Sequence, residues 1–164
     1  MLQLIKTNSE NEDFRALVKL LDADLAVRDG DDHAFYSQYN KIYLIKHVIV
    51  AYENETPIGC GAIKIYQPDT MEVKRMFVKP DYRGKGAASK ILTALELWAK
   101  ELGCDKCILE TGTRQPEAIE LYKKTGYKII PNYGQYENIQ NSLCFEKILD
   151  THQFSHTRRV LFKN

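Results

Sequence analysis

Between positions 78 and 88 the chain reads Val78-Lys79-Pro80-Asp81-Tyr82-Arg83-Gly84-Lys85-Gly86-Ala87-Ala88. A strand-like run precedes this segment and a periodic helical run follows it, so the loop leads into a helix. The start of a helix offers unpaired backbone N–H groups and the positive end of the helix dipole. Gly84 and Gly86 carry no side chain that would keep a ligand away, and Arg83 and Lys85 add positive charge. The segment therefore predicts a binding loop for a phosphate or pyrophosphate.

Two better-known phosphate motifs fit this loop poorly. A Walker loop requires G-x-x-x-x-G-K-[ST], and a dinucleotide fingerprint requires G-x-G-x-x-G after a first parallel strand. The pair Gly84 and Gly86 satisfies neither pattern. A glycine-softened turn without a ligand is the plain alternative, and the agreement of charge, spacing and position argues against it.

The residues at the start of the chain predict a strand and then a helix. Residues 2–6 alternate in character and end in turn chemistry at Asn8. Ser9 and Glu12 have the spacing of a capping box, so a helix is expected from there to about Val27. Gly30, within an aspartate-rich stretch, breaks that helix.

A second short helix is expected after Asp32, which can cap it. It would carry Phe35, Tyr36 and Tyr39. Residues 48–52, 58–66 and 71–78 then predict three strands of an antiparallel meander, with turn residues between them.

Downstream of the loop, apolar residues at helical spacing predict a long helix from Ala88 to Leu102, stopped by Gly103. A strand over residues 106–110 would complete a parallel crossover. A helix over 116–124 and strands over 127–130 and 142–148 close the pattern. The whole predicts a single mixed α/β domain over residues 1–150, with residues 151–164 as a C-terminal appendage.

Composition excludes several classes of protein. The chain has 164 residues, of which 44% are hydrophobic and 27% charged, which is ordinary for a globular domain. Its formal charge of +1 gives no overall attraction to nucleic acid or to an anionic membrane. No apolar run approaches the roughly 20 residues that span a bilayer, and the N-terminal residues do not resemble a signal peptide. A cytoplasmic protein is expected.

Four cysteines are too few for a disulfide scaffold in a chain of this size. Cys104 and Cys107 form a C-x-x-C pair, but no second pair and no nearby histidine completes a zinc set. We expect reduced thiols and no metal site.

Two motifs in this sequence resemble those of the GNAT superfamily of N-acetyltransferases. Arg83-x-x-Gly86-x-Ala88 is similar to its signature R/Q-x-x-G-x-G/A. The run Gln115-x-x-Ala118-x-x-Leu121-Tyr122-x-x-x-Gly126-Tyr127 resembles its second recurring segment, in which asparagine is commoner than glutamine at the first position. The likeness covers roughly residues 48–147. It implies a mostly antiparallel sheet of about six to seven strands with helices on both faces, and acetyl-CoA (CoA) as co-substrate.

The resemblance also implies where the cofactor lies. The pantetheine arm would pair with the backbone of the strand before the loop, through Met76 and Val78, and a bulge is common in that strand. The implied cofactor-binding residues are Met76, Phe77, Val78, Arg83, Gly84, Lys85, Gly86, Ala87, Ala88 and Gln115.

Transfer of an acetyl group to an amine needs a neutral nucleophile, a polarised thioester and a proton for the departing thiolate. Tyr122 matches the family's tyrosine that donates this proton. Glu72 is the expected base, with Glu110 as the alternative. A turn with Tyr133 and Tyr136 is expected near the acceptor, which would be a primary amine of a small molecule or peptide.

Other readings stay open at this stage. The aspartates at 22, 24, 29, 31 and 32 could favour a cationic acceptor or only solvate a loop. A homodimer is possible. One rival is a domain that binds acyl-CoA as a sensor without transfer, and another is a nucleotide or nucleic-acid binder using Arg83, Lys85 and the basic C-terminus.

Overall fold

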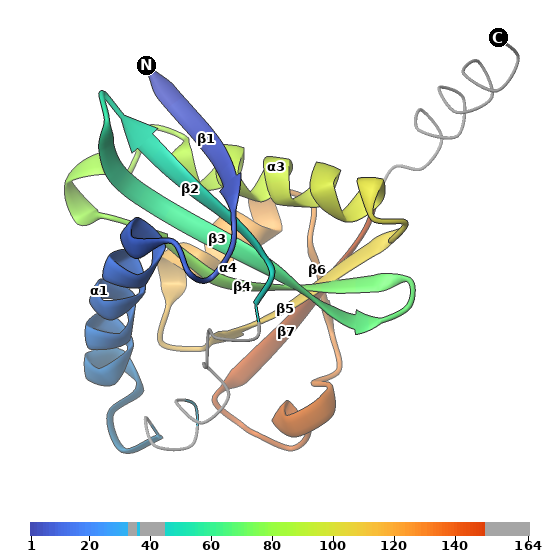
Figure 1. The fold of residues 1–164 in the computed structure, drawn as a ribbon. Helices are drawn as coiled ribbons and strands as arrows, with labels where there is room; N and C mark the ends of the chain where they lie inside the picture. Colours follow the sequence, from blue (N-terminus) through green and yellow to red (C-terminus); the bar gives the residue numbers. More distant parts are fainter. Residues whose placement is uncertain (33–35, 37–44, 150–164) are drawn as a thin grey trace, which may run out of the picture.

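The computed structural model describes residues 1–32, 36 and 45–149. One sheet has seven strands in the order β1-β2-β3-β4-β5-β7-β6 (Figure 1). The strands are Leu2–Thr7 (β1), His47–Glu53 (β2), Thr56–Gln67 (β3), Thr70–Val78 (β4), Lys106–Gly112 (β5), Lys128–Ile130 (β6) and Ser142–Ile148 (β7). Neighbouring strands are antiparallel except β4 and β5, which are parallel. The predicted mixed sheet with one parallel crossover is confirmed.

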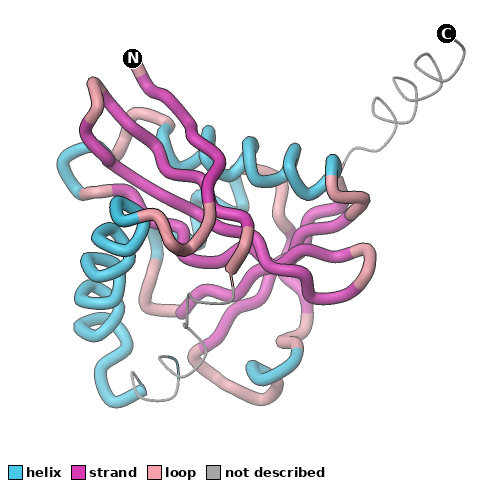
Figure 2. The backbone as a smooth tube through the Cα atoms, in the orientation of Figure 1, coloured by secondary structure: helices cyan, strands magenta, loops and turns pink. Residues whose placement is uncertain are grey.

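Helices cover both faces of this sheet, as predicted (Figure 2). Helix α1 (Glu12–Asp29) packs on one face, and α3 (Ala87–Glu101) and α4 (Pro116–Lys124) pack on the other. Strand β2 shows why both faces need cover. Val48 contributes to the core under α1, whereas its neighbour Ile49 contributes to the core under α3, because side chains alternate across a strand.

The predicted capping box at the start of α1 is wrong. The N-cap is Asn11, whose side chain accepts a 2.9 Å hydrogen bond from the backbone N–H of Phe14. Ser9 is instead held by backbone bonds, since its N–H bonds the carbonyl of Ile45 and its carbonyl accepts from Arg15. The helix therefore starts at Glu12. The predicted second helix lies outside the described residues except for Tyr36, and the predicted appendage at 151–164 lies wholly outside them.

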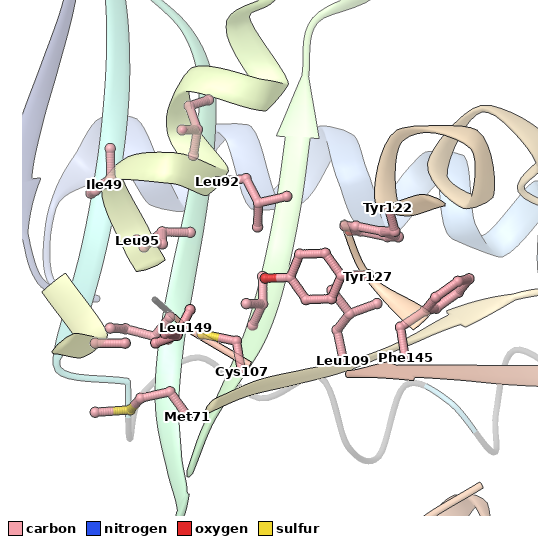
Figure 3. Packing of buried hydrophobic residues seen from close by; sticks show 14 of the residues in the cluster. Ile49, Met71, Leu92, Leu95, Cys107, Leu109, Tyr122, Tyr127, Phe145 and Leu149 are labelled. Carbon is pink, nitrogen blue, oxygen red and sulfur yellow. The ribbon is translucent and has the colours of Figure 1, made fainter. Parts of the chain in front are cut away.

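The larger hydrophobic core lies between the sheet and helices α3 and α4. Figure 3 shows Leu92 and Leu95 of α3 close to the strands, and Tyr122 of α4 near Tyr127 and Phe145. The ring centroid of Tyr122 lies 5.8 Å from each of those two rings. Aromatic pairs at this spacing stabilise a core by about 0.5–1.5 kcal/mol beyond their buried area.

Strand β4 contains a bulge that changes which side its residues face. Its register with β3 pairs Ala62 with Lys74 but Cys60 with Phe77, so two residues of β4 lie opposite one of β3. Within the bulge Arg75 has φ of +59°, a left-handed backbone that few non-glycine residues adopt. Val73 packs in the core under α3, whereas Phe77 packs under α1. The bulge expected from the family resemblance is therefore present.

Strands β4 and β5 separate soon after they meet. Their parallel pairing covers three residue pairs, Thr70 with Lys106, Met71 with Cys107 and Glu72 with Ile108. Beyond Glu72, β4 continues to Val78 without a ladder to β5. The sheet is open at this point, next to the loop that leads into α3. No helix in the described part of the chain is both long and apolar enough to cross a bilayer.

Candidate active site

A cleft of about 800 Å³ lies at the start of α3, beside the open part of the sheet. This volume is within the usual range of 300–1,000 Å³ for small-molecule sites. The end of β4, the loop and α4 line it. The lining residues that the sequence predicted are Met76, Phe77, Val78, Arg83, Gly84, Gly86, Ala87, Ala88, Gln115 and Tyr122. Lys85 is exposed and does not line the cleft.

The loop has the backbone that anion binding requires. Gly84 and Gly86 have φ of +80° and +85°, and a Cβ atom added at either position would meet no heavy atom within 4 Å. The N-cap of α3 is Gly86, which supplies no side-chain hydrogen bond. The N–H groups of the first helical turn therefore have no cap from the Gly86 side chain, and Ala87, Ala88 and Ser89 of that turn line the cleft.

Arg83 supports the loop from within. Its Nε donates a 2.7 Å hydrogen bond to the carbonyl of Val78, and its guanidinium lies 5.6 Å from the ring centroid of Phe77. These contacts tie the loop to the end of β4. Arg83 thus has a structural role that the sequence motif did not indicate.

A smaller cavity of about 110 Å³ adjoins the cleft. Five residues line both spaces: Leu21, Met76, Gln115, Ala118 and Tyr122. The remaining wall of the cavity is rich in ionisable and aromatic groups, namely Asp29, Tyr36, Glu72, Lys74, Arg75, Glu110 and Tyr136. The cleft and the cavity therefore meet at the Tyr122 side chain.

Tyr122 is held firmly at this junction. Its side chain is buried, and its ring packs against Tyr127 and Phe145. Burial raises the pKa of the phenol well above its usual value, and the nearby Glu110 carboxylate raises it further. Tyr122 is therefore protonated at neutral pH and available as a proton donor.

Glu110 has the properties of a proton acceptor. Burial raises its pKa to about 7, although a hydrogen bond from Ser142 partly opposes this rise. Its Oε2 is buried and has no hydrogen-bond partner among the described residues. A carboxylate with a pKa near the working pH and an unused oxygen is suited to general base catalysis.

Glu72, the base expected from the sequence, is engaged with other groups. Its Oε2 accepts a 2.6 Å hydrogen bond from the Tyr133 hydroxyl, and its Oε1 lies 3.9 Å from Nζ of Lys74. It still lines the cavity with Glu110. Tyr136 also lines the cavity, while Tyr133 contacts it through its hydrogen bond to Glu72.

Most of the aspartates near α1 are bound in ion pairs. Asp22 pairs with Arg75 of β4, Asp24 with Arg28, and Asp32 with Arg114. Of the five aspartates at positions 22, 24, 29, 31 and 32, only Asp29 lines the small cavity. The sequence grouped these aspartates together because they are close along the chain, whereas the fold gives three of them different ion-pair partners.

The C-x-x-C pair is part of the core. Cys104 and Cys107 are buried free thiols, and burial raises the pKa of both, that of Cys107 to about 12. Such thiols are unreactive at neutral pH. Among residues 1–32, 36 and 45–149, no three His, Cys, Asp or Glu side chains are grouped as a metal site.

Comparison with known proteins identifies this arrangement. A family model described as the acetyltransferase (GNAT) family matches residues 14–127. The chain belongs to the acetyltransferase (GNAT) family. The matched region of this GNAT protein begins in α1 and ends after α4, so it includes the open sheet, the loop and Tyr122.

Curated relatives are similar over part of their length. An IAA acetyltransferase of Azospirillum brasilense is 40% identical over 105 residues, which make up 62% of this chain and 67% of that protein. The uncharacterized N-acetyltransferase YjgM of Escherichia coli is 35% identical over 97 residues, 58% of this chain and 56% of that protein. The chain thus spans about half to two thirds of these relatives.

Solved structures match over nearly the whole chain. A structure assigned to the acyl-CoA N-acyltransferases, from Klebsiella pneumoniae, has a TM-score of 0.77 and 27% identity, and covers 91% of this chain and 98% of its own. The PaiA N-acetyltransferase of Thermoplasma acidophilum, solved in complex with coenzyme A, has a TM-score of 0.67 and 19% identity, with coverages of 90% and 99%. The second likeness concerns the fold alone.

Several residues that line the small cavity were not predicted from the sequence. Lys74 and Arg75 line the small cavity although they are consecutive residues of one strand. A strict period of two places neighbours on opposite faces, and only the bulge brings both to one side. Tyr36 comes from the segment after α1, where no motif pointed to the cavity, whereas Asp29 was one of the aspartates considered for a cationic acceptor.

Proposed function

We propose that this GNAT protein transfers the acetyl group of acetyl-CoA to a primary amine. The observation that carries the proposal is the position of Tyr122 and Glu110. Tyr122 lies where the large cleft meets the small cavity, and Glu110 lies in the cavity wall. A proton donor and a proton acceptor thus both line the small cavity, and the donor also lines the cleft, so each space can hold one of the two substrates.

The large cleft fits a cofactor with a diphosphate and a long arm. The diphosphate would bind the N–H groups at the start of α3, where Gly84 and Gly86 leave open space. The arm would lie along β4 from Val78 to Met76, since β4 has no ladder to β5 there and its backbone groups face the opening. A Thermoplasma protein with this fold was solved in complex with coenzyme A, which supports the choice of coenzyme A as the ligand.

Acetyl-CoA supplies an acyl group activated as a thioester. In the transfer, the amine nitrogen forms a bond to the thioester carbonyl carbon, and the carbon–sulfur bond breaks. Glu110 accepts the proton that the amine loses, and Tyr122 donates a proton to the departing sulfur. The raised pKa of each group suits this role, because Glu110 becomes ionised as the pH rises through about 7 while Tyr122 remains a phenol.

Glu72 was the base expected from the sequence, with Glu110 as the alternative. The contacts favour Glu110, because both oxygens of Glu72 have neighbours and Oε2 of Glu110 has none in the described part of the molecule. In this proposal Glu72 holds Lys74 in the cavity wall and is itself held by the hydroxyl of Tyr133.

A sensor that binds acyl-CoA without transfer is the second candidate. It has no use for a buried acid and base at the meeting point of two cavities, which is why the transferase is favoured. Free-thiol release from acetyl-CoA in the presence of a panel of amines separates the two. Thiol release that depends on an amine supports transfer, whereas a thermal shift with CoA and no turnover with any amine supports the sensor.

A further inference from the structure

The bulge in β4 gives the small cavity two adjacent cationic residues. Lys74 and Arg75 are consecutive, yet both line the cavity, because a bulge can aim two neighbouring side chains at one side of a sheet. Nζ of Lys74 lies 3.9 Å from Glu72, and Arg75 pairs with Asp22 of α1. The ion pair with Asp22 fixes the guanidinium on the face that α1 covers.

Both cations sit where water is scarce. The Arg75 side chain is 2% exposed and that of Lys74 is 10% exposed. Nε of Arg75 is buried and lacks a hydrogen-bond partner among the described residues. Burial lowers the pKa of Lys74, which is the response of an ammonium to lost hydration. A buried cation gains from an anion brought in by a ligand.

The same wall carries an anionic group suited to an amine. Glu110 lines the cavity together with Tyr122, at the place proposed for the transfer. The cavity therefore presents the cations Lys74 and Arg75 together with the carboxylates of Asp29, Glu72 and Glu110 around one space of about 110 Å³. A ligand with a positive and a negative end would match a wall that carries charges of both signs, whereas a ligand with positive charges alone would bring no anion to Lys74 and Arg75.

We propose that the acceptor is a small zwitterion, an amino acid or a similar amino carboxylate, whose amine faces Glu110 and Tyr122 and whose carboxylate faces Lys74 and Arg75. This inference rests on the proposed transferase function. The product is the N-acetylated amino carboxylate, and the free thiol of CoA is released. The apolar side chains of Leu21 and Leu25, which also line the cavity, leave room for a short side chain.

The test uses matched acceptors with the full chain. Glycine and L-alanine are compared with glycinamide and L-alaninamide, and with methylamine and ethylamine, by thiol release from acetyl-CoA; spermidine represents polycations. We expect kcat/KM to be at least tenfold higher for the amino acids than for their amides. The amides have less basic amines and are more often neutral, so nucleophilicity cannot produce this preference.

Lys74→Gln tests the contact directly. It should raise KM for the amino acids about tenfold with little change in kcat, and leave KM for the amides unchanged. The control is Lys64→Gln, which removes the same charge from an exposed position on the neighbouring strand β3. Lys64→Gln should leave the ratio of kcat/KM for the amino acids to kcat/KM for their amides unchanged.

Several outcomes would overturn the inference. The first is an equal kcat/KM for the amino acids and their amides. The second is a ratio of these two values that Lys74→Gln leaves unchanged, and the third is a ratio that changes equally in both lysine variants. Turnover of spermidine or simple amines without amino acids would also overturn it, while the transferase function would stand. Absence of turnover with every amine would remove both proposals, and absence of a thermal shift with CoA would remove the cofactor assignment itself.

Discussion

The hydroxyl of Tyr133 donates a 2.6 Å hydrogen bond to Oε2 of Glu72. The bond joins the loop after β6 to strand β4 and fixes a carboxylate that would otherwise be a candidate base. Glu110, in the same cavity wall, has no such donor on its Oε2 among the described residues. The two carboxylates therefore differ in how freely they can take up a proton.

Exchange of each carboxylate for its amide separates their roles. Glu110→Gln should lower kcat by about 100-fold or more, since loss of a general base typically costs 10² to 10⁴ in rate. Glu72→Gln keeps an oxygen that accepts from Tyr133 and should lower kcat less than tenfold. Steady-state thiol release measures both variants. The reverse order of effects would return the role of base to Glu72.

The raised pKa of Glu110 also predicts how stability depends on pH. The folded state binds the proton more tightly than the unfolded state, whose glutamate has a pKa of about 4.5. Stability from this group is complete below pH 4.5 and is lost as the pH rises to about 7. Glu110→Gln avoids that loss, so it should be more stable than the wild type by about 2–3 kcal/mol at pH 8.

Below pH 4.5 the advantage of Glu110→Gln should disappear, because both side chains are then neutral. Chemical denaturation at several pH values gives the difference. A stability difference that does not vary with pH would show that Glu110 titrates normally in the folded protein. The kcat of the wild type should rise with pH through about 7, as Glu110 ionises.

Tyr122→Phe removes one oxygen and keeps the ring. Because the contacts with Tyr127 and Phe145 are made by the ring, we expect unfolding free energy to change by no more than about 1 kcal/mol. The kcat should fall about 10- to 100-fold, because the sulfur leaves without a positioned proton donor. Thermal shift with CoA should be unchanged. An unchanged kcat would remove Tyr122 from the proton transfer.

Gly86→Glu should abolish the thermal shift produced by CoA. At about 100 times its Kd, a ligand stabilises a protein by roughly 2.7 kcal/mol, and a carboxylate placed at the start of α3 would repel the diphosphate. The matched control is Gly103→Glu at the other end of α3. Gly103 has φ of +91° and open space around its Cβ position, as Gly86 does. The control carries similar backbone strain and should keep its response to CoA.

The order of elements could be predicted because each rests on a local signal. The spacing of apolar residues in α3, the glycines of the loop and Pro116 at the start of α4 act within a few residues of one another. The capping residue of α1 was mistaken because two patterns overlapped. Ser9 with Glu12 and Asn11 with Phe14 have the same spacing, and only the tertiary bond of Ser9 to Ile45 decides between them.

Most of the residues predicted to bind the cofactor line the large cleft, and they could be named from local motifs, whereas the wall of the small cavity could not be predicted in this way. Strand β4 was expected to carry a bulge, but which residues it aims at the cavity depends on its pairing with β3. The environment of Glu110 depends on groups far away in the chain, such as Ser142 on β7 and Asp29 at the end of α1. Such contacts leave no periodic trace in the sequence.

The short pairing of β4 with β5 has a mechanical consequence. The backbone ladder that joins strands β1 to β4 with strands β5 to β7 consists of the three pairs from Thr70 to Glu72, so the two halves of the sheet are hinged about a narrow strip. A ligand lying along β4 would act as an extra strand and stiffen that hinge. When CoA is added, amide hydrogen exchange should become slower in both halves of the sheet, including at residues far from the bound molecule. This slowing would measure the gain in rigidity.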